Sequence, residues 1–277
     1  MAQTPWQPVT PAQEAAVRAR LAAVRGFLLD LDGTFYLGDR LLDGSLDFLE
    51  TLRRIGRSAL FLTNNSSRSG AAYVDKLRRL GVTAPFLQVL TSGQAAGRYV
   101  LRRFGTQPGY LLGTPALREE LCAMGVALSE QQPAYVLLAF DTALTYAGLT
   151  RVCDLVRSGL PYIATHPDFN CPTEGGFIPD IGATIAYVHA STGRRPDVVI
   201  GKPNAGIAEE AQRLLGLPRE QLAMVGDRLY TDIATGICCG MTSILVLTGE
   251  ATAAEAAASE WKPDLTFDRL ASMNAYL

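Results

Sequence analysis

Acidic side chains follow an apolar run near the start of the chain, with a spacing that could hold a divalent cation. The run that begins at Gly26 ends in Asp30-Leu31-Asp32-Gly33-Thr34. Side chains two apart on a strand point the same way, and carboxylates that close repel each other unless a cation lies between them. Carboxylate and phosphate oxygens are the ligands that Mg²⁺ prefers. An Asp-Gly pair alone would favour an Asx turn, but the full pattern directly after an apolar strand favours a Mg²⁺ site.

A second acidic pair lies late in the chain. The apolar run 222–225 leads into Gly226-Asp227, and Asp232 follows five residues further on. Alone, this pattern suits a loop with a helix cap equally well. Beside Asp30 and Asp32 it completes the predicted cation site.

Two other strand ends carry groups that suit phosphate. Thr63-Asn64-Asn65 follows the apolar run 59–62, and a hydroxyl with a backbone amide at a helix entrance can hold a phosphate oxygen. Gly201-Lys202-Pro203 follows the run 198–200 in a chain with 3 lysines and 22 arginines. A compact ammonium suits a single phosphate oxygen, so Lys202 is predicted to bind phosphate rather than to be a solvated surface lysine.

The elements that must position these groups alternate along the chain. Strand-like runs lie near Val89, Tyr110, Val136, Ile163, Val198, Met224 and Leu245, and stretches of helical period separate most of them. This alternation predicts an α/β fold with a parallel sheet. In such sheets ligands bind outside the carboxyl ends of the strands, which is where the acids, the amides and the lysine stand.

Composition excludes several classes of protein. The chain has 277 residues, 48% of them apolar and 19% charged, which suits a globular protein of about two domains. A net charge of −2 argues against a nucleic-acid or membrane partner, and the longest apolar run, 134–140, is too short to span a bilayer. Five scattered cysteines predict free thiols and a cytoplasmic location.

Together these motifs resemble those of the haloacid dehalogenase superfamily of aspartate-nucleophile phosphatases. Asp30–Thr34, Thr63-Asn64, Lys202 and the Asp227–Asp232 pair occur in the family's order. The doubled Asn64-Asn65 and the long insertion before Lys202 look like the NagD-type, p-nitrophenyl phosphatase-like subfamily. The resemblance covers nearly the whole chain from Gly26.

The resemblance implies a Rossmann-like catalytic core with an inserted α/β cap domain. The core is predicted at residues 1–97 and 196–277, and the cap at 98–195. The cap stretch 165–182 is predicted to be a long ordered loop that sets substrate specificity, because its Gly, Pro and polar content suits a functional loop. Its candidate residues are His166, Asp168, Asn170 and Cys171. Cys171 stands near a position where pyridoxal-phosphate phosphatases place a His, which disfavours that substrate.

The residues and the resemblance imply the same mechanism. Asp30 attacks phosphorus to form an aspartyl-phosphate, and Asp32 is the general acid and base. The Mg²⁺ ligands are predicted to be Asp30, Asp32 through its backbone carbonyl, Asp227 and Asp232. Phosphate binding is assigned to Gly33, Thr63, Asn64, Asn65 and Lys202.

The predicted function is therefore Mg²⁺-dependent hydrolysis of a small phosphate ester, such as a sugar phosphate or a nucleoside monophosphate. A phosphotransferase or mutase on the same scaffold is an alternative within enzymes. A regulator that binds a phosphorylated metabolite without turnover is the alternative from another class; the retained Asp30 and Asp32 argue against it. The expected partners are the small phosphate ester and a second copy of the chain through the cap.

Overall fold

The computed structural model describes residues 10–173 and 175–277, which form two compact units. The first unit holds the described chain as far as Leu62, together with Val74–Val89 and Ala211–Leu277. The second unit holds Thr63–Tyr73 and Leu90–Glu210. The predicted domain limits at 97/98 and 195/196 stay a prediction. Among the described residues, no helix is both long and apolar enough to cross a bilayer.

A six-stranded sheet forms the centre of the first unit, in the order β14-β13-β12-β1-β4-β5. Every pairing from β14 across to β4 is parallel, as the alternating sequence predicts. In this register Leu29 of β1 lies between Val225 of β12 and Phe61 of β4. The carboxyl ends of these three strands therefore end at one edge of the sheet. The strands are β1 (Gly26–Leu29), β4 (Ser58–Thr63), β5 (Val89–Thr91), β12 (Leu222–Gly226), β13 (Thr242–Val246) and β14 (Leu265–Phe267).

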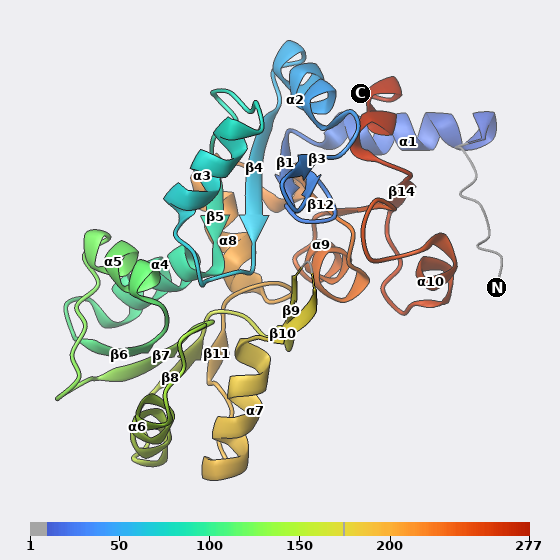
Figure 1. Ribbon diagram of the computed structural model, residues 1–277. Helices are drawn as coiled ribbons and strands as arrows, with labels where there is room; N and C mark the ends of the chain where they lie inside the picture. The colour runs from blue at the N-terminus through green and yellow to red at the C-terminus, as the bar shows by residue number, and fades with distance from the viewer. Residues whose placement is uncertain (1–9, 174) are drawn as a thin grey trace. The chain divides into compact units, whose positions relative to one another are not determined.

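Helices cover this sheet and bury its apolar strands (Figure 1). All four residues of β1 are buried, as expected of a central parallel strand. The ring of Phe27 in β1 packs edge-to-face on Phe48 of α2, with 5.5 Å between ring centres. The remaining elements are α1 (Pro11–Ala23), the hairpin β2 (Tyr36–Leu37) and β3 (Arg40–Leu41), α2 (Ser45–Arg54), α3 (Gly70–Arg79), α8 (Ala205–Leu215), η1 (Arg219–Gln221), η2 (Leu229–Ile233), α9 (Ala234–Cys238), α10 (Ala253–Ala258) and η3 (Leu270–Ala275).

The second unit has its own parallel sheet, in the order β11-β8-β7-β6. This confirms the prediction that the chain contains an inserted α/β domain besides the core. The strands of this sheet are β6 (Gly109–Leu112), β7 (Tyr135–Leu138), β8 (Tyr162–Ala164) and β11 (Val198–Val199). The strand before Lys202 thus pairs with β8. One face buries Val136 against α6 (Tyr146–Arg157) and α7 (Ile181–Thr192). On the other face Tyr135 stacks on Phe104 of α4 (Ser92–Phe104), beside α5 (Pro115–Ala123).

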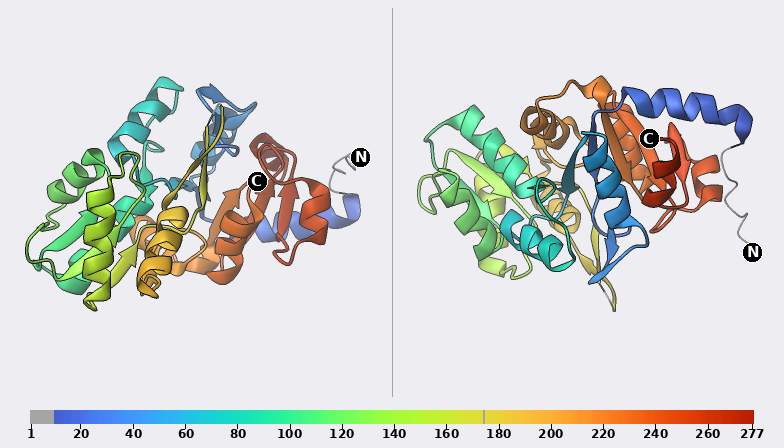
Figure 2. Two further views of the ribbon diagram at one scale, coloured as in Figure 1. Left: turned by 60° about the horizontal axis from the view of Figure 1, so that its bottom comes forward. Right: turned by 90° about the horizontal axis from the view of Figure 1, so that it is seen from above.

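The prediction of a long loop over 165–182 is wrong in part. Within this stretch β9 (Asn170–Thr173) and β10 (Gly176–Pro179) form an antiparallel hairpin that leads into α7 (Figure 2). Pro172 lies opposite Phe177, and Pro179 lies opposite Asn170. A two-stranded hairpin tolerates proline because each strand is also an edge and needs fewer ladder hydrogen bonds. The Gly and Pro content of this stretch therefore predicted a loop and did not indicate the two strands.

Replacing Phe27 tests the packing of the first unit. Its ring is fully buried against Phe48, so we expect Phe27→Ala to lower the free energy of unfolding by about 3 to 5 kcal/mol. Urea denaturation measures this difference. Phe177→Ala is the control, because that ring is 74% exposed and its loss should cost under about 0.5 kcal/mol. Equal effects of the two substitutions would contradict the assigned core.

Candidate active site

Three carboxylates gather where neighbouring strands of the first unit end. Asp30 directly follows β1, Asp227 directly follows β12, and Asp232 lies in the π-helical turn η2. One carboxylate oxygen from each of the three residues lies within 4.8 Å of those from the other two. Asp227 and Asp232 are buried and Asp30 is partly buried. The structure thus brings together three of the four acids that the sequence singled out.

Neighbouring groups hold the acidic cluster in place. Asp227 accepts hydrogen bonds from the Thr34 hydroxyl at 3.1 Å and from the Glu250 backbone amide at 2.8 Å. Asp232 accepts one from the Arg228 backbone amide at 3.1 Å. Gly33 has a φ of +90°, and a Cβ there would lie 2.5 Å from an Asp227 oxygen. Glycine at this position lets the backbone turn and lets the carboxylate approach it.

Burial and mutual repulsion set the electrostatics of the cluster. Loss of hydration and, after it, the negative charge of Asp232 together raise the pKa of Asp227 to about 6. Arg228 lies among the same acids. Burial alone would lower the pKa of its guanidinium, but Asp30, Asp232 and Asp227 raise it overall. The Arg228 Nε also lies 3.1 Å from a carboxylate oxygen of Glu250. Arg228 is thus a counter-charge that the sequence patterns did not identify.

This cluster fits a divalent cation. Buried carboxylates within one coordination distance of each other are costly without a positive charge between them, and oxygen donors suit a hard dication. Asp30, Asp227 and Asp232 are the residues that would hold it. The carboxylate of Asp32 is exposed and lies outside this group, in the part of the chain that the structure describes.

Asp32 instead lies beside the small β2–β3 hairpin. It makes a bridge to Tyr36, and the Lys76 ammonium lies 3.9 Å from the centre of that tyrosine ring. The same ammonium lies 3.4 Å from a carboxylate oxygen of Asp39. Partial loss of hydration raises the pKa of Asp32, and the charge of Lys76 opposes the rise. A raised pKa suits a carboxyl group that must carry a proton part of the time.

Four of the five predicted phosphate-binding residues, Thr63, Asn64, Asn65 and Lys202, lie in the second unit, and Gly33 lies in the first. The Asn64 Oδ1 accepts a hydrogen bond from the Lys202 backbone amide at 2.7 Å, and its Nδ2 donates to the Lys202 carbonyl at 3.0 Å. The Nδ2 also donates to the Asp168 carboxylate at 3.1 Å. Lys202 is 3% exposed. The side chain of Asn64 therefore fixes the backbone of Lys202.

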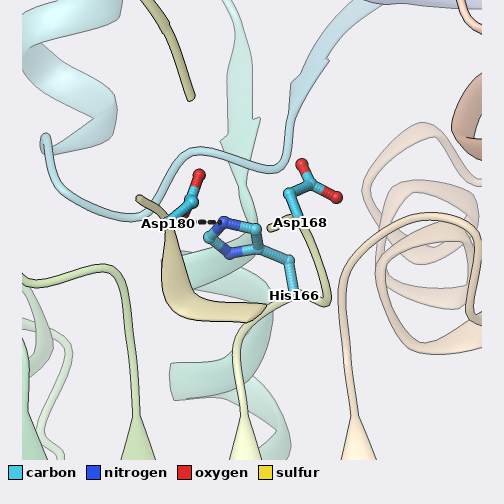
Figure 3. A group of neighbouring side chains, drawn as sticks. All are labelled: His166, Asp168 and Asp180. Atoms are coloured by element: carbon cyan, nitrogen blue, oxygen red, sulfur yellow. Dashed lines mark hydrogen bonds and ion pairs between the residues drawn. The ribbon is translucent and has the colours of Figure 1, made fainter. Parts of the chain in front are cut away.

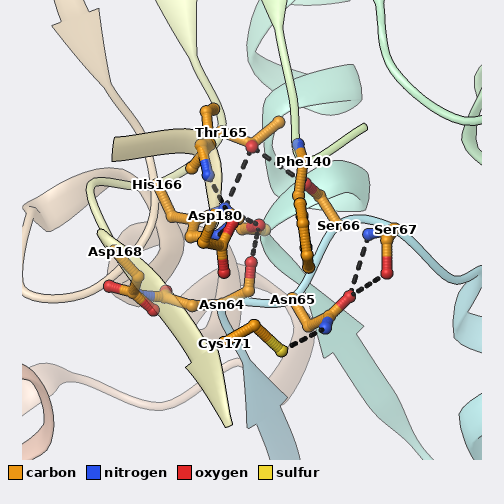
Figure 4. Close-up of polar contacts among 12 residues, drawn as sticks. Asn64, Asn65, Ser66, Ser67, Phe140, Thr165, His166, Asp168, Cys171 and Asp180 are labelled. Carbon is orange, nitrogen blue, oxygen red and sulfur yellow. Dashed lines mark hydrogen bonds and ion pairs between the residues drawn. The ribbon is translucent and has the colours of Figure 1, made fainter. Parts of the chain in front are cut away.

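Thr63, Asn65 and Cys171 are linked by further contacts in this unit. Thr63 ends β4, and its hydroxyl accepts a hydrogen bond from the Asn65 amide at 3.2 Å. The Asn65 side chain donates to the sulfur of Cys171 at 3.8 Å (Figure 4). Asn170 lies exposed at the start of β9. The loop after β4 thus contacts the hairpin that follows β8.

His166, Asp168 and Asp180 form a second group of polar side chains in this unit (Figure 3). The Nε2 of His166 lies 3.1 Å from an Asp180 oxygen. Asp180 is the N-terminal cap of α7, where its carboxylate accepts a hydrogen bond from Ile181 at 2.5 Å. Asp180 was not among the residues that the sequence motifs predicted. Its position one residue before an apolar helical run is the signal that could have identified it as a cap.

Comparison with known proteins relates this chain to phosphatases. A family model described as haloacid dehalogenase-like hydrolase matches residues 27–127, and a HAD-hydrolase-like model matches residues 199–273. A 5′-nucleotidase of Bacillus subtilis is 33% identical over 91% of this chain and 98% of its own length. An acid sugar phosphatase of Staphylococcus aureus is 35% identical over 89% and 95%. The structure of a 4-nitrophenylphosphatase from Thermotoga maritima has a TM-score of 0.89 and 47% identity, over 92% of this chain and 98% of that one.

The burial of Asp227, together with its repulsion by Asp232, predicts a pH-dependent stability. The folded pKa of Asp227, about 6, lies above its ordinary value of 3.8, so the metal-free folded state holds the proton more tightly than the unfolded chain. Stability should therefore fall as pH rises from about 4 to about 6 and remain lower above. Asp227→Asn removes this charge. Its amide oxygen can still accept from the Glu250 amide, while its NH₂ donates to the Thr34 hydroxyl.

We expect Asp227→Asn to be more stable than the wild type at pH 7.5 in EDTA, by about 1 to 3 kcal/mol. The difference should vanish near pH 4. Adding a divalent cation should raise the melting temperature of the wild type and leave that of the variant nearly unchanged. A wild type that is the more stable protein in EDTA at pH 7.5 would contradict the assigned repulsion.

Proposed function

Because this chain belongs to the haloacid dehalogenase-like hydrolases and is a phosphatase of the p-nitrophenyl phosphatase-like subfamily, we propose that it hydrolyses small phosphorylated metabolites through an aspartyl-phosphate on Asp30. The observation that carries this proposal is the cluster of Asp30, Asp227 and Asp232 at adjoining strand ends. The names of the relatives, a 5′-nucleotidase and acid sugar phosphatases, support nucleoside monophosphates and sugar phosphates as the substrate class.

Two carboxylates share the chemical work. An Asp30 oxygen forms a bond to phosphorus while the bond from phosphorus to the ester oxygen breaks. Asp32 gives its proton to the departing alcohol. Asp32 then takes a proton from a water molecule whose oxygen attacks the aspartyl-phosphate. The bond between Asp30 and phosphorus breaks, so inorganic phosphate leaves and both carboxyl groups return to their starting forms.

The remaining residues stabilise charge. We assign Mg²⁺ as the divalent cation, held by the carboxylates of Asp30, Asp227 and Asp232 and by the backbone carbonyl of Asp32. When bound, it neutralises part of the charge on the phosphoryl oxygens. Gly33, Thr63, Asn64, Asn65 and Lys202 are proposed to bind those oxygens by amides, a hydroxyl and a positive charge. In phosphoryl transfer such positioning and charge stabilisation supply most of the catalysis.

Substrate choice is proposed to depend on the hairpin of the second unit. Asn170 is exposed and Cys171 is partly exposed, so both can present side chains to a leaving group. Asp168 is partly buried and holds Asn64. His166 has no exposed surface, so any effect it has on catalysis must pass through its neighbours. Pairing of two copies through this unit stays a prediction.

Asp30→Asn tests the nucleophile. The amide keeps the shape of the side chain but cannot form the aspartyl-phosphate, so hydrolysis of p-nitrophenyl phosphate with Mg²⁺ should fall at least about 1,000-fold. Asp154→Asn is a matched control on the surface of α6, where Asp154 pairs with Arg157. It should be as active as the wild type. Turnover of Asp30→Asn near the wild-type rate, with folding intact by circular dichroism, would exclude the mechanism.

Lys202→Arg tests whether the buried ammonium acts on phosphate. Arginine keeps the positive charge but brings a larger planar group to a side chain that is 3% exposed. We expect kcat for p-nitrophenyl phosphate to fall at least about tenfold in Lys202→Arg and further in Lys202→Ala. Lys262→Arg, at an exposed position, should be unchanged. If both Lys202 variants match the wild type, then Lys202 has no role in catalysis.

A further inference from the structure

His166 stands at one end of a buried chain of hydrogen bonds in the second unit. Its Nδ1 lies 3.0 Å from the Thr165 hydroxyl, and that hydroxyl lies 3.0 Å from the Ser66 hydroxyl. Ser66 in turn accepts a hydrogen bond from the Phe140 backbone amide at 3.0 Å. Figure 4 shows these contacts between the loop after β4 and the end of β8. Thr165, His166 and Ser66 have no exposed surface.

The two ends of this hydrogen-bond chain limit what each end group can do. The Phe140 amide can only donate, and an ionised Asp180 carboxylate can only accept. A hydroxyl donates one hydrogen bond and can accept two, so either Ser66 or Thr165 can be the donor between them. In the arrangement that keeps the His166 Nδ1 as an acceptor, Ser66 donates to Thr165 and Thr165 donates to that nitrogen. The Nε2 of His166 carries the ring proton and donates to Asp180 at 3.1 Å.

This hydrogen-bond chain passes through the loop that holds Lys202. Ser66 is two residues from Asn64, whose side chain binds both the amide and the carbonyl of Lys202. On its other side Asn64 is held by Ser92, whose hydroxyl donates to the Asn64 carbonyl. The Ser92 oxygen also lies 3.3 Å from the His166 Nδ1. The imidazole thus lies against Ser92 directly and is linked to Ser66 through Thr165.

We propose that His166, held by Asp180 as the Nε2–H tautomer, is a positioning residue that orients the Asn64 loop and the backbone of Lys202. The inference rests on the proposed function for its effect on catalysis. The position of the ring proton and of the loop can be measured without any substrate. A metal ion is not the occupant that this geometry favours, because the Nε2 already bonds to Asp180 and the Asp168 carboxylate already accepts from Asn64.

Imidazole nitrogen NMR tests the tautomer directly. The chain has 2 histidines, so His189→Asn assigns both sets of signals by elimination. We expect the His166 Nε2 to be protonated, with a slowly exchanging proton, and the Nδ1 to be bare. Protonation at Nδ1, or rapid exchange of the ring proton with water, would overturn the proposal.

Two substitutions at His166 separate the two ring nitrogens. In His166→Asn the amide oxygen can replace Nδ1 as the acceptor for Thr165, while the bond to Asp180 is lost. In His166→Gln the amide nitrogen can reach Asp180, while the Thr165 hydroxyl loses its acceptor. We expect kcat for p-nitrophenyl phosphate to fall about tenfold in His166→Gln and less than about threefold in His166→Asn, with KM within about twofold in both. A purely structural role would lower the melting temperature of both variants and leave kcat of both unchanged.

Ser66→Ala breaks the same chain of hydrogen bonds at its centre. Combined with His166→Gln it gives a double-mutant cycle. We expect Ser66→Ala to lose kcat about as much as His166→Gln does, and the double variant to lose no more than either single one. Ser69→Ala is the matched control, because the Ser69 hydroxyl accepts a hydrogen bond from the Ala72 amide and, among the described residues, bonds to none of this hydrogen-bond chain or of the phosphate site. Additive losses, or a kcat of Ser66→Ala equal to that of Ser69→Ala, would overturn the proposal.

The Lys202 backbone amide gives a readout that does not depend on turnover. Its resonance should shift in His166→Gln and in Ser66→Ala and should stay in place in Ser69→Ala. A wild type without activity on any phosphate ester would refute the proposed function alone. An unshifted Lys202 amide in both broken-chain variants would refute the positioning role alone.

Discussion

The carboxylates of Asp30, Asp227 and Asp232 repel one another, and the first unit is built to hold them together in spite of that repulsion. Parallel pairing of β1 with β12 brings Asp30 and Asp227 to one edge of the sheet. The π-helical turn η2 then returns Asp232 to the same place. The apolar strands behind them supply the packing that offsets the electrostatic cost. The site is thus assembled from strand ends, and the energy that holds it comes from the buried sheet.

In the second unit, hydrogen bonds fix the position of one positively charged residue, Lys202. Lys202 is held through its backbone by Asn64, so its long side chain begins from a defined point. Asn64 belongs to a loop that is tied by Ser92 on one side and by the Ser66–Thr165–His166 contacts on the other. Each of these groups is buried, where an unsatisfied hydrogen bond is costly. Buried polar networks of this kind favour one arrangement over its neighbours.

The fold and the acidic cluster could be predicted from the sequence because both depend on local patterns. Apolar runs marked the strands, and the rule that ligands meet the carboxyl ends of parallel strands placed Asp30 beside Asp227. Residues whose roles arise from distant contacts could not be found this way. Arg228 acts by charge on three acids, and Ser66 is an ordinary serine until the fold brings Thr165 to it. The hairpin after β8 was hidden because Pro172 and Pro179 occupy strand positions that usually reject proline.

The scarcity of lysine, together with its burial, has a practical consequence for chemical labelling. Lys202 is almost entirely enclosed, and the Lys76 side chain is only 14% exposed against Tyr36 and Asp39. Lys262 is the exposed one of the three. An amine-reactive dye or surface linker should therefore react with Lys262 far faster than with the other two lysines. The protein thus carries a natural attachment point, distant in sequence from every residue assigned to catalysis, for tethering the protein to a sensor or a bead.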